Sequence, residues 1–307
     1  MARATLVRIL RALATVLIVA TIVFVIIRLT GDPIRSVVPE GSPPEIEALY
    51  RQRWGLDKPI WEQYLVYLAG IARGDFGQSY FDSAPALDVV AARIPATLQL
   101  TVPAFIVSTS VGLSVGVFAA LHRGKWLDRV LSSTSVILGA IPSFALGVVL
   151  VLVFAVTLRW LPSAGNTTPM HLVMPLIAMA LAPAALLARM TRASMSDALS
   201  LPSIEHAASL GLPRWKQVLQ YALPNAFLPL ITILGFDIAY LLAGSSVVEV
   251  LFSWPGIGRL FVQAAGQRDF AVVQCVVLLV TVSVVLVNLL TDMSYKIADP
   301  RLRRSKA

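Results

Sequence analysis

The chain has 307 residues, a net charge of +8 and a single cysteine, and only 14% of its residues are charged. Soluble domains carry about 25% charged residues, whereas 57% of this chain is apolar and its mean hydropathy is +0.78. This composition excludes an ordinary cytosolic enzyme and a disordered chain, and the lone Cys275 excludes a fold built on internal disulfides. The composition predicts an all-α integral membrane protein.

Long stretches without Asp, Glu, Lys or Arg locate the membrane-spanning segments. A spanning helix needs about 20 mostly apolar residues. The sequence predicts six such helices, at 9–29, 97–121, 130–157, 172–192, 226–248 and 270–294. Because no repeat or low-complexity tract separates them, we expect residues 1–307 to form a single transmembrane domain.

The distribution of positive charge orients the predicted helices. More than half of the Lys and Arg residues fall in segments that share one side of the membrane if both termini lie inside. Since short inner loops carry an excess of Lys and Arg, we expect an N-inside, C-inside protein with an external segment at 30–95 and a cytoplasmic loop at 193–225. The first apolar run is also compatible with a signal peptide, but Arg28 directly follows it and no small-residue cleavage site is present, which favours an uncleaved anchor.

The external segment contains one amphipathic pattern. Trp61, Tyr64, Leu65 and Leu68 recur at helical spacing and form an apolar, aromatic face. Such a helix lies on the outer membrane interface or packs as a small cap on the helix bundle, and the sequence leaves both alternatives open.

The inner loop at 193–225 carries the clearest helix signals outside the spans. Pro202 suits a first helical position, Glu205 suits the first turn, and Gly211 suits the turn after a helix end. These signals predict a short helix over 202–211. A second helix is expected at 214–223, ending at Leu223 and Pro224.

This loop resembles the EAA loop of ABC-importer permeases, in which Glu-Ala-Ala is followed by a glycine and then by Ile-x-Leu-Pro. The matching positions are Glu205, Ala207, Gly211, Leu223 and Pro224. His206 replaces the first alanine and Tyr221 replaces the isoleucine. Residues 193–213 contain no Lys or Arg. Permeases similar to this chain usually carry Lys and Arg in the corresponding helix, so contacts made by those basic residues in relatives cannot be transferred to this chain.

Further motifs cover nearly the whole chain in the order seen in one branch of that family, and they make the chain similar to the B-type permease subunit of dipeptide and oligopeptide importers. The motifs are Thr30-Gly31-Asp32-Pro33, Gly55-Leu56-Asp57-Lys58-Pro59, Arg73-Gly74-Asp75-Phe76-Gly77, Arg93-Ile94-Pro95-Ala96-Thr97, Ile141-Pro142-Ser143-Phe144, Phe252-Ser253-Trp254-Pro255-Gly256-Ile257-Gly258 and Asp299-Pro300-Arg301-Leu302-Arg303.

The resemblance implies a type I ABC-importer permease fold in the bacterial cytoplasmic membrane. It implies a second homologous permease, two cytoplasmic ATPase subunits that use the ATP, and an external substrate-binding protein. The helix at 202–211 would dock on an ATPase subunit, and the residues assigned to this coupling are Glu205, Ala207, Ala208, Gly211, Leu223 and Pro224. In agreement, the sequence contains no G-x-x-x-x-G-K-[ST] phosphate-binding loop.

Polar residues at membrane depth are candidates for a translocation path or gate. Asp237 lies in the middle of the fifth predicted span and Glu249 lies near its outer end, and an ionisable residue in a span is a functional candidate by default. Trp254, Pro255 and Gly256 suit an outer loop that folds back as a gate. Helix packing is the slightly favoured alternative for Asp237, and a rigid turn is an equally good interpretation of the loop.

The sequence therefore predicts a channel-forming subunit of an ATP-driven importer, with di- or oligopeptides as the favoured substrate. Importers of nickel chelates, glutathione and oligosaccharides share the same permease pattern. Two more distant alternatives are a secondary transporter, which usually shows two related halves, and a membrane enzyme, which needs a paired catalytic constellation. We expect no catalytic residue, metal site, cofactor or nucleic-acid partner in this chain.

Overall fold

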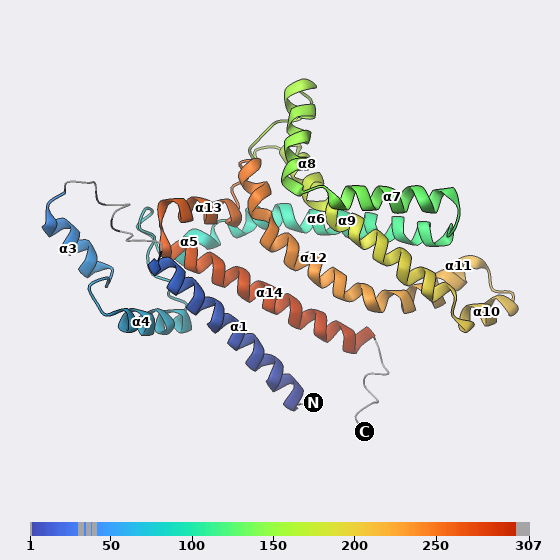
Figure 1. Cartoon of the computed structure of the whole chain (residues 1–307), viewed down its shortest axis with the longest axis horizontal. Helices are drawn as coiled ribbons and strands as arrows, with labels where there is room; N and C mark the ends of the chain where they lie inside the picture. Colours follow the sequence, from blue (N-terminus) through green and yellow to red (C-terminus); the bar gives the residue numbers. More distant parts are fainter. Residues whose placement is uncertain (1, 30–33, 35–37, 39–41, 299–307) are drawn as a thin grey trace. The chain divides into compact units, whose positions relative to one another are not determined.

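The computed structural model describes residues 2–29, 34, 38 and 42–298, which are mostly helical (Figure 1). The chain divides into two compact units. Unit 1 comprises residues 1–97 and 255–285, and unit 2 comprises residues 98–254 and 286–307. Two of the motifs that carry the family resemblance, Thr30-Gly31-Asp32-Pro33 and Asp299-Pro300-Arg301-Leu302-Arg303, lie outside the described residues. Helices α6 (Ile94–Leu121) and α14 (Phe270–Ala298) each begin in unit 1 and end in unit 2, and a single transmembrane domain stays a prediction.

Unit 1 combines the N-terminal helices with the segment after residue 254. Its elements, besides the shared α6 and α14, are α1 (Ala2–Leu29), α3 (Pro44–Arg53), α4 (Ile60–Arg73), α5 (Ala86–Ala91) and α13 (Ile257–Gln267). Its core brings together apolar residues of α5, α13 and α14, namely Ala86, Val90, Ile257, Ala264, Ala271, Val272, Cys275 and Val276. Beside this core, the hydroxyl of Ser79 donates a hydrogen bond to the carboxylate of Asp269 at 2.5 Å.

Helix α4 lies in the segment predicted to be external and packs on α1. The hydroxyls of Thr21 and Tyr64 are 2.7 Å apart, and the Phe24 ring contacts Tyr64 and Tyr67 at centroid distances of 5.2 and 5.4 Å. Burial raises the pKa of Tyr67 to about 12, so this phenol stays neutral. Trp61 and Leu65 remain exposed on α4, which therefore caps α1 with one side and leaves an apolar side uncovered in this chain.

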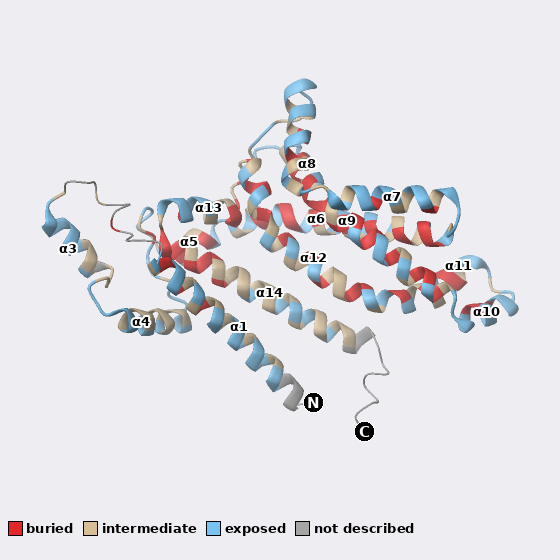
Figure 2. Ribbon diagram, in the orientation of Figure 1, coloured by how far each residue is buried: buried red, intermediate tan, exposed pale blue. Residues whose placement is uncertain are grey.

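Unit 2 is arranged around the long helix α9. Its elements are α7 (Trp126–Ala140), α8 (Ser143–Leu150), the π-helix η1 (Val151–Thr157), α9 (Met170–Leu199), α10 (Pro202–Ser209), α11 (Arg214–Lys216), the π-helix η2 (Gln217–Ala222) and α12 (Leu223–Leu251). Helix α9 packs against α7, α8 and α12, and it carries buried residues from Met174 to Ala198, drawn red in Figure 2.

The segment predicted as the third span, 130–157, consists of two helices. Helices α7 and α8 with η1 meet at a bend of 95°. Ile141, between them, has extended backbone angles (φ −79°, ψ 120°), because the ring of Pro142 disfavours the helical conformation in the residue before it. The predicted span 130–157 is therefore bent at Pro142, and as one broken span it remains compatible with the prediction.

The described part of the chain supports the predicted class of fold. By length and composition, five helical stretches can cross a membrane, and the bent pair α7 and α8–η1 makes a sixth if it counts as one span. The five are Leu6–Leu29, Ala86–Leu121, Met170–Leu199, Arg214–Leu251 and Phe270–Tyr295. The sequence prediction of an all-α protein with six spans agrees with this arrangement.

A glycine sets the distance between α6 and α9 in unit 2. A Cβ atom added at Gly116 would lie 2.5 Å from the Cβ of Thr191 and 2.6 Å from the carbonyl oxygen of Ala188. Small residues at helix crossings let two backbones approach closely, which supplies packing energy where lipid offers no hydrophobic driving force. Gly139 of α7 contrasts with Gly116, because a Cβ there would meet only the Cβ of Ala185 at 3.5 Å.

We expect Gly116→Ala to destabilise the chain by about 1–3 kcal/mol, because the added methyl group overpacks the contact between α6 and α9. The same change at Gly139 should be neutral or stabilising by up to about 1 kcal/mol, since alanine has the higher helix propensity and finds room there. Unfolding midpoints of the two purified variants in detergent would test this. Equal midpoints would show that α6 does not depend on a close approach at Gly116.

Candidate functional site

The short helix predicted at 202–211 is present as α10 (Pro202–Ser209). Leu201 before it has extended backbone angles, and Pro202 occupies the first turn, where the missing amide hydrogen costs nothing. Gly211 after it has φ +73°. The amide of Gly211 donates to the carbonyl of Ala208 at 3.0 Å, and that of Leu212 donates to the carbonyl of Ala207 at 3.2 Å. The start signal and the stop signal in the sequence are both confirmed as local structure.

Helix α10 is seated on unit 2 through one face. Ile204 and Ala207 are 4% and 1% exposed, and Ile204 joins a cluster in which α6, α9, η2 and the start of α12 meet. The other buried members of this cluster are Ala120, Met195, Ala198, Val218, Ala222 and Ala226. Figure 1 shows α10 at the end of α9, next to α11.

The opposite face of α10 is exposed. It carries Glu205, His206, Ala208 and Ser209, and Leu210 just beyond the helix is 64% exposed. Among the described residues of α10 this face offers a carboxylate, an imidazole and small side chains, and no arginine or lysine. Because Ile204 and Ala207 anchor α10 in unit 2 and its opposite face is exposed, another protein can bind that face while α10 stays in place.

The residues assigned to the coupling loop therefore fall into three groups. Glu205 and Ala208 lie on the exposed face, and Gly211 forms the exposed turn. Ala207 is buried and cannot contact another protein while α10 is seated. Leu223 is half-buried and packs against the cluster under α10, whereas Pro224 is exposed.

The second helix of the loop does not end at Leu223 and Pro224, as the sequence analysis expected. Helix α11, η2 and α12 follow one another without a gap from Arg214 to Leu251. Pro224 lies in the first turn of α12. There its missing amide donor is tolerated, and the preceding turn widens into a π-helix instead of terminating. Pro224 was predicted to end the second helix of the loop, whereas it lies in the first turn of α12.

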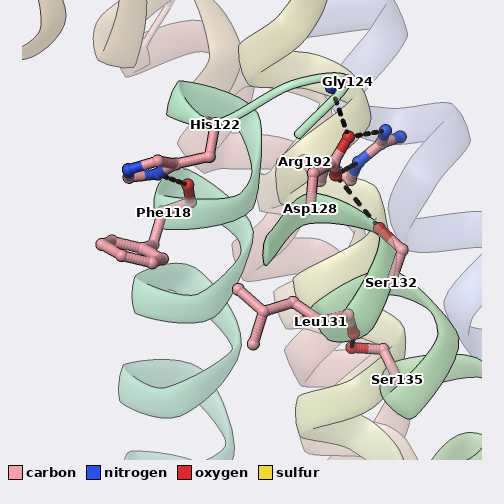
Figure 3. A network of polar contacts seen from close by, with 8 residues as sticks. All are labelled: Phe118, His122, Gly124, Asp128, Leu131, Ser132, Ser135 and Arg192. Carbon is pink, nitrogen blue, oxygen red and sulfur yellow. Dashed lines mark hydrogen bonds and ion pairs between the residues drawn. The ribbon is translucent and has the colours of Figure 1, made fainter. Parts of the chain in front are cut away.

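A charged network at the end of α9 was missed by the sequence analysis (Figure 3). The guanidinium of Arg192 in α9 contacts both carboxylate oxygens of Asp128 in α7, with Nη2 at 2.7 Å from Oδ2 and Nε on Oδ1. The amide of Gly124 and the hydroxyl of Ser132 donate to the same carboxylate at 3.0 and 3.3 Å. The two charges are 64 positions apart, and the sequence showed only that each lies beside an apolar segment.

The two acids considered for a path are both buried. Asp237 is 3% exposed, and its Oδ2 has no hydrogen-bond partner among the described residues. Glu249 is fully buried at the end of α12, and its carbonyl oxygen accepts a hydrogen bond of 2.8 Å from the amide of Trp254. A role in a translocation path stays a prediction for both acids.

The predicted gate loop is short, and its residues are divided between the two units. In unit 2, Trp254 is 4% exposed. In unit 1, Gly256 precedes α13, and the amide of Ile257 donates to the hydroxyl of Thr97 at 2.8 Å. A small cavity of about 170 Å³ at the start of α13 is lined by Arg93, Pro255, Gly256, Arg259, Leu260 and Gln263. A gate function for Trp254, Pro255 and Gly256 stays a prediction.

Comparison with known families matches almost the entire chain. Residues 112–304 match the family described as "Binding-protein-dependent transport system inner membrane component". Residues 1–101 match the N-terminal region described for the membrane component of the same systems. The first match alone covers more than half of the chain.

Curated relatives are similar over their full length. The glutathione transport system permease protein GsiC of Escherichia coli strain K12 is 38% identical over 298 residues, which are 96% of this chain and 97% of that protein. The protein of the same name from Salmonella choleraesuis strain SC-B67 is 37% identical over 297 residues, with the same coverage of both chains.

Solved structures show the same fold at lower identity. A chain of the MetNI methionine ABC transporter in an inward-facing conformation superposes with a TM-score of 0.57 and 22% identity, over 69% of this chain and 96% of that one. A chain of an amino acid ABC transporter with histidines superposes with a TM-score of 0.54 and 20% identity, over 68% and 94% of the two chains.

The turn at Gly211 generates a prediction about α10. A Cβ at this position meets nothing within 4 Å, so any cost of a substitution comes from the positive φ angle alone. We expect Gly211→Val to cost about 1–2 kcal/mol and Gly211→Asn much less, because asparagine tolerates left-handed backbone angles. Hydrogen–deuterium exchange over 202–213 should become roughly 5- to 30-fold faster in the valine variant. Equal exchange in both variants would show that α10 does not depend on this turn.

Proposed function

The chain belongs to the family of binding-protein-dependent transport system inner membrane components, and on this premise we propose that it forms part of the channel of an importer for short peptides. Membership makes it a multi-pass permease subunit of the bacterial inner membrane, which works with a separate ATPase and a substrate-binding protein. The subunit has no ATPase site of its own. The importer class follows from the family, while the substrate, the second permease subunit and the coupling residues belong to the proposal.

The single observation that carries the proposed mechanism is the exposed face of α10. Charge asymmetry supports an orientation with both termini inside, which puts the loop 193–225 in the cytoplasm, where the ATPase subunits act. The exposed residues Glu205 and Ala208 then meet the ATPase, while Ile204 and Ala207 anchor the helix in unit 2. Closure of the ATPases would thus move α10 together with the ends of α6, α9 and η2.

A second homologous permease completes the proposed channel. Spanning helices α1, α6 and α12 expose large apolar side chains such as Leu17, Ile106 and Phe236, and these face lipid or a second permease. Asp237 and Glu249 are proposed to stay close to the path as buried polar groups, and Trp254, Pro255 and Gly256 are proposed to close its outer end.

Short peptides are the proposed substrates because the motifs of the whole chain are similar to those of dipeptide and oligopeptide permeases. The second candidate is glutathione, which is favoured by the name of relatives that are 38% identical over 96% of the chain. Glutathione is itself a tripeptide, so both candidates offer an amino group, amide bonds and carboxylates for recognition. The binding protein mainly selects the substrate. The channel that this chain helps to form must let through whichever of the two candidates the binding protein delivers.

The proposed substrate can be tested with the complete importer, including its own binding protein, in liposomes loaded with ATP. We expect uptake of a labelled dipeptide such as dialanine, and competition by unlabelled di- and tripeptides. Nickel chelates should neither enter nor compete. Uptake of labelled glutathione that excess dialanine and trialanine leave unchanged would instead identify a glutathione importer.

The proposed docking face can be tested with one substitution at three sites. We expect Ala208→Leu to leave the subunit folded and joined to its partner permease but to weaken recovery of the ATPase at least several-fold, because a bulky side chain prevents close approach. Ala207→Leu should instead destabilise unit 2, since this residue is 1% exposed. Ala72→Leu, on the exposed side of α4, is the matched control and should change neither property. Normal ATPase recovery with Ala208→Leu would exclude α10 as the docking helix.

A further inference from the structure

We propose that Asp128 and Arg192 form a positioning pair, which holds the end of α9 that carries α10 in register with the turn between α6 and α7. The inference rests on the proposed function of α10 as the helix that receives the movement of the ATPase. The pair Asp128 and Arg192 would transmit this movement from α10 to the membrane-spanning helices.

The pair has a defined two-point geometry. The carboxylate of Asp128 accepts hydrogen bonds from four donors on three elements: two guanidinium nitrogens of Arg192, the amide of Gly124 and the hydroxyl of Ser132 (Figure 3). The side chain of Asp128 is 4% exposed and that of Arg192 is 34% exposed. A two-point contact between a planar guanidinium and a buried carboxylate sets orientation as well as distance, which a flexible surface ion pair does not.

The pair also lies close, along α9, to the residues that hold α10. The residue next to Arg192, Thr191, packs closely on Gly116 of α6. Met195 and Ala198, in the following turns of α9, belong to the cluster that holds Ile204 of α10. The ion pair, the close helix crossing and the seat of α10 therefore follow one another along less than three turns of one helix. A displacement of α10 reaches α7 and α6 through this short segment.

Helix α9 contains a proline before this segment, at which the helix can bend. Pro183 lies inside α9, so the helix lacks the backbone hydrogen bond that residue 183 would donate. Thr191 and Arg192, which bind the end of α9 to α6 and α7, both come after Pro183. These contacts make the C-terminal part of α9 move with α6 and α7 rather than bend at the proline.

A merely structural role makes a different prediction from a positioning role. Removing one member of a buried ion pair leaves an uncompensated charge, so truncation of either residue lowers the amount of folded protein whichever role is correct. Arg192→Lys separates the two roles, because lysine keeps the positive charge but cannot make the two-point contact. Arg189→Lys is the matched control, since Arg189 is exposed on the same helix one turn earlier.

The experiment uses the complete importer in liposomes, with labelled dialanine and labelled glutathione as the two probes. We expect Arg192→Lys to assemble in normal amounts and to hydrolyse ATP at the basal rate, but to transport several-fold less substrate per ATP hydrolysed. Arg189→Lys should behave as the unmodified protein. If Arg192→Lys changes transport and hydrolysis only in proportion to the amount of assembled complex, the pair is structural and the proposal is overturned.

Two further variants keep the outcome decisive. Asp128→Asn combined with Arg192→Gln removes both charges without leaving either one unpaired, so it tests the proposal if Arg192→Lys does not assemble. We expect this double variant to assemble and to remain poorly coupled, and full coupling would overturn the positioning role. Ala208→Leu in the same assay tests the function of α10 separately: if this variant transports normally, α10 is not the coupling helix and the failure lies with the proposed function.

Discussion

Hydrocarbon offers no hydrogen-bond partner to a backbone amide, and this constraint governs the structure of the chain. Every long apolar segment in the described residues satisfies its backbone within a helix. The same constraint explains where irregular features occur. The bend between α7 and α8 lies at Pro142, and the buried carboxylate of Asp128 is surrounded by four donors. Several buried polar atoms of the described residues lack such a partner, and among them Oδ2 of Asp237 is the only one from a carboxylate predicted to lie in the middle of a span.

Helix α10 meets two requirements with only 8 residues. In its proposed role it must be attached firmly enough to transmit force, and it must remain accessible to another subunit. Burial of Ile204 and Ala207 meets the first requirement, and the exposed side with Glu205 and Ala208 meets the second. The consecutive alanines of the motif thus point in different directions, so equal substitutions at Ala207 and Ala208 have different physical consequences.

A local signal with two meanings misplaced one predicted helix end. Proline both starts and stops helices, and Pro224 was taken for a stop although it lies in the first turn of α12. Pro142 lies inside a long apolar run, and the apolar run alone does not show that the segment consists of two helices. Hydropathy averages over a window and does not register a single bend, whereas the backbone angles of one residue decide it.

The sequence by itself determined the class of the protein, the approximate spans, the short helix after α9 and the family. These properties depend on composition, on apolar runs and on motifs that are contiguous in the chain. Only the tertiary structure decided which face of α10 is buried, how closely α6 approaches α9 at Gly116, and that Asp128 pairs with Arg192. These properties join residues far apart in the chain, and their partners depend on how the helices pack, which no local pattern in a single sequence records.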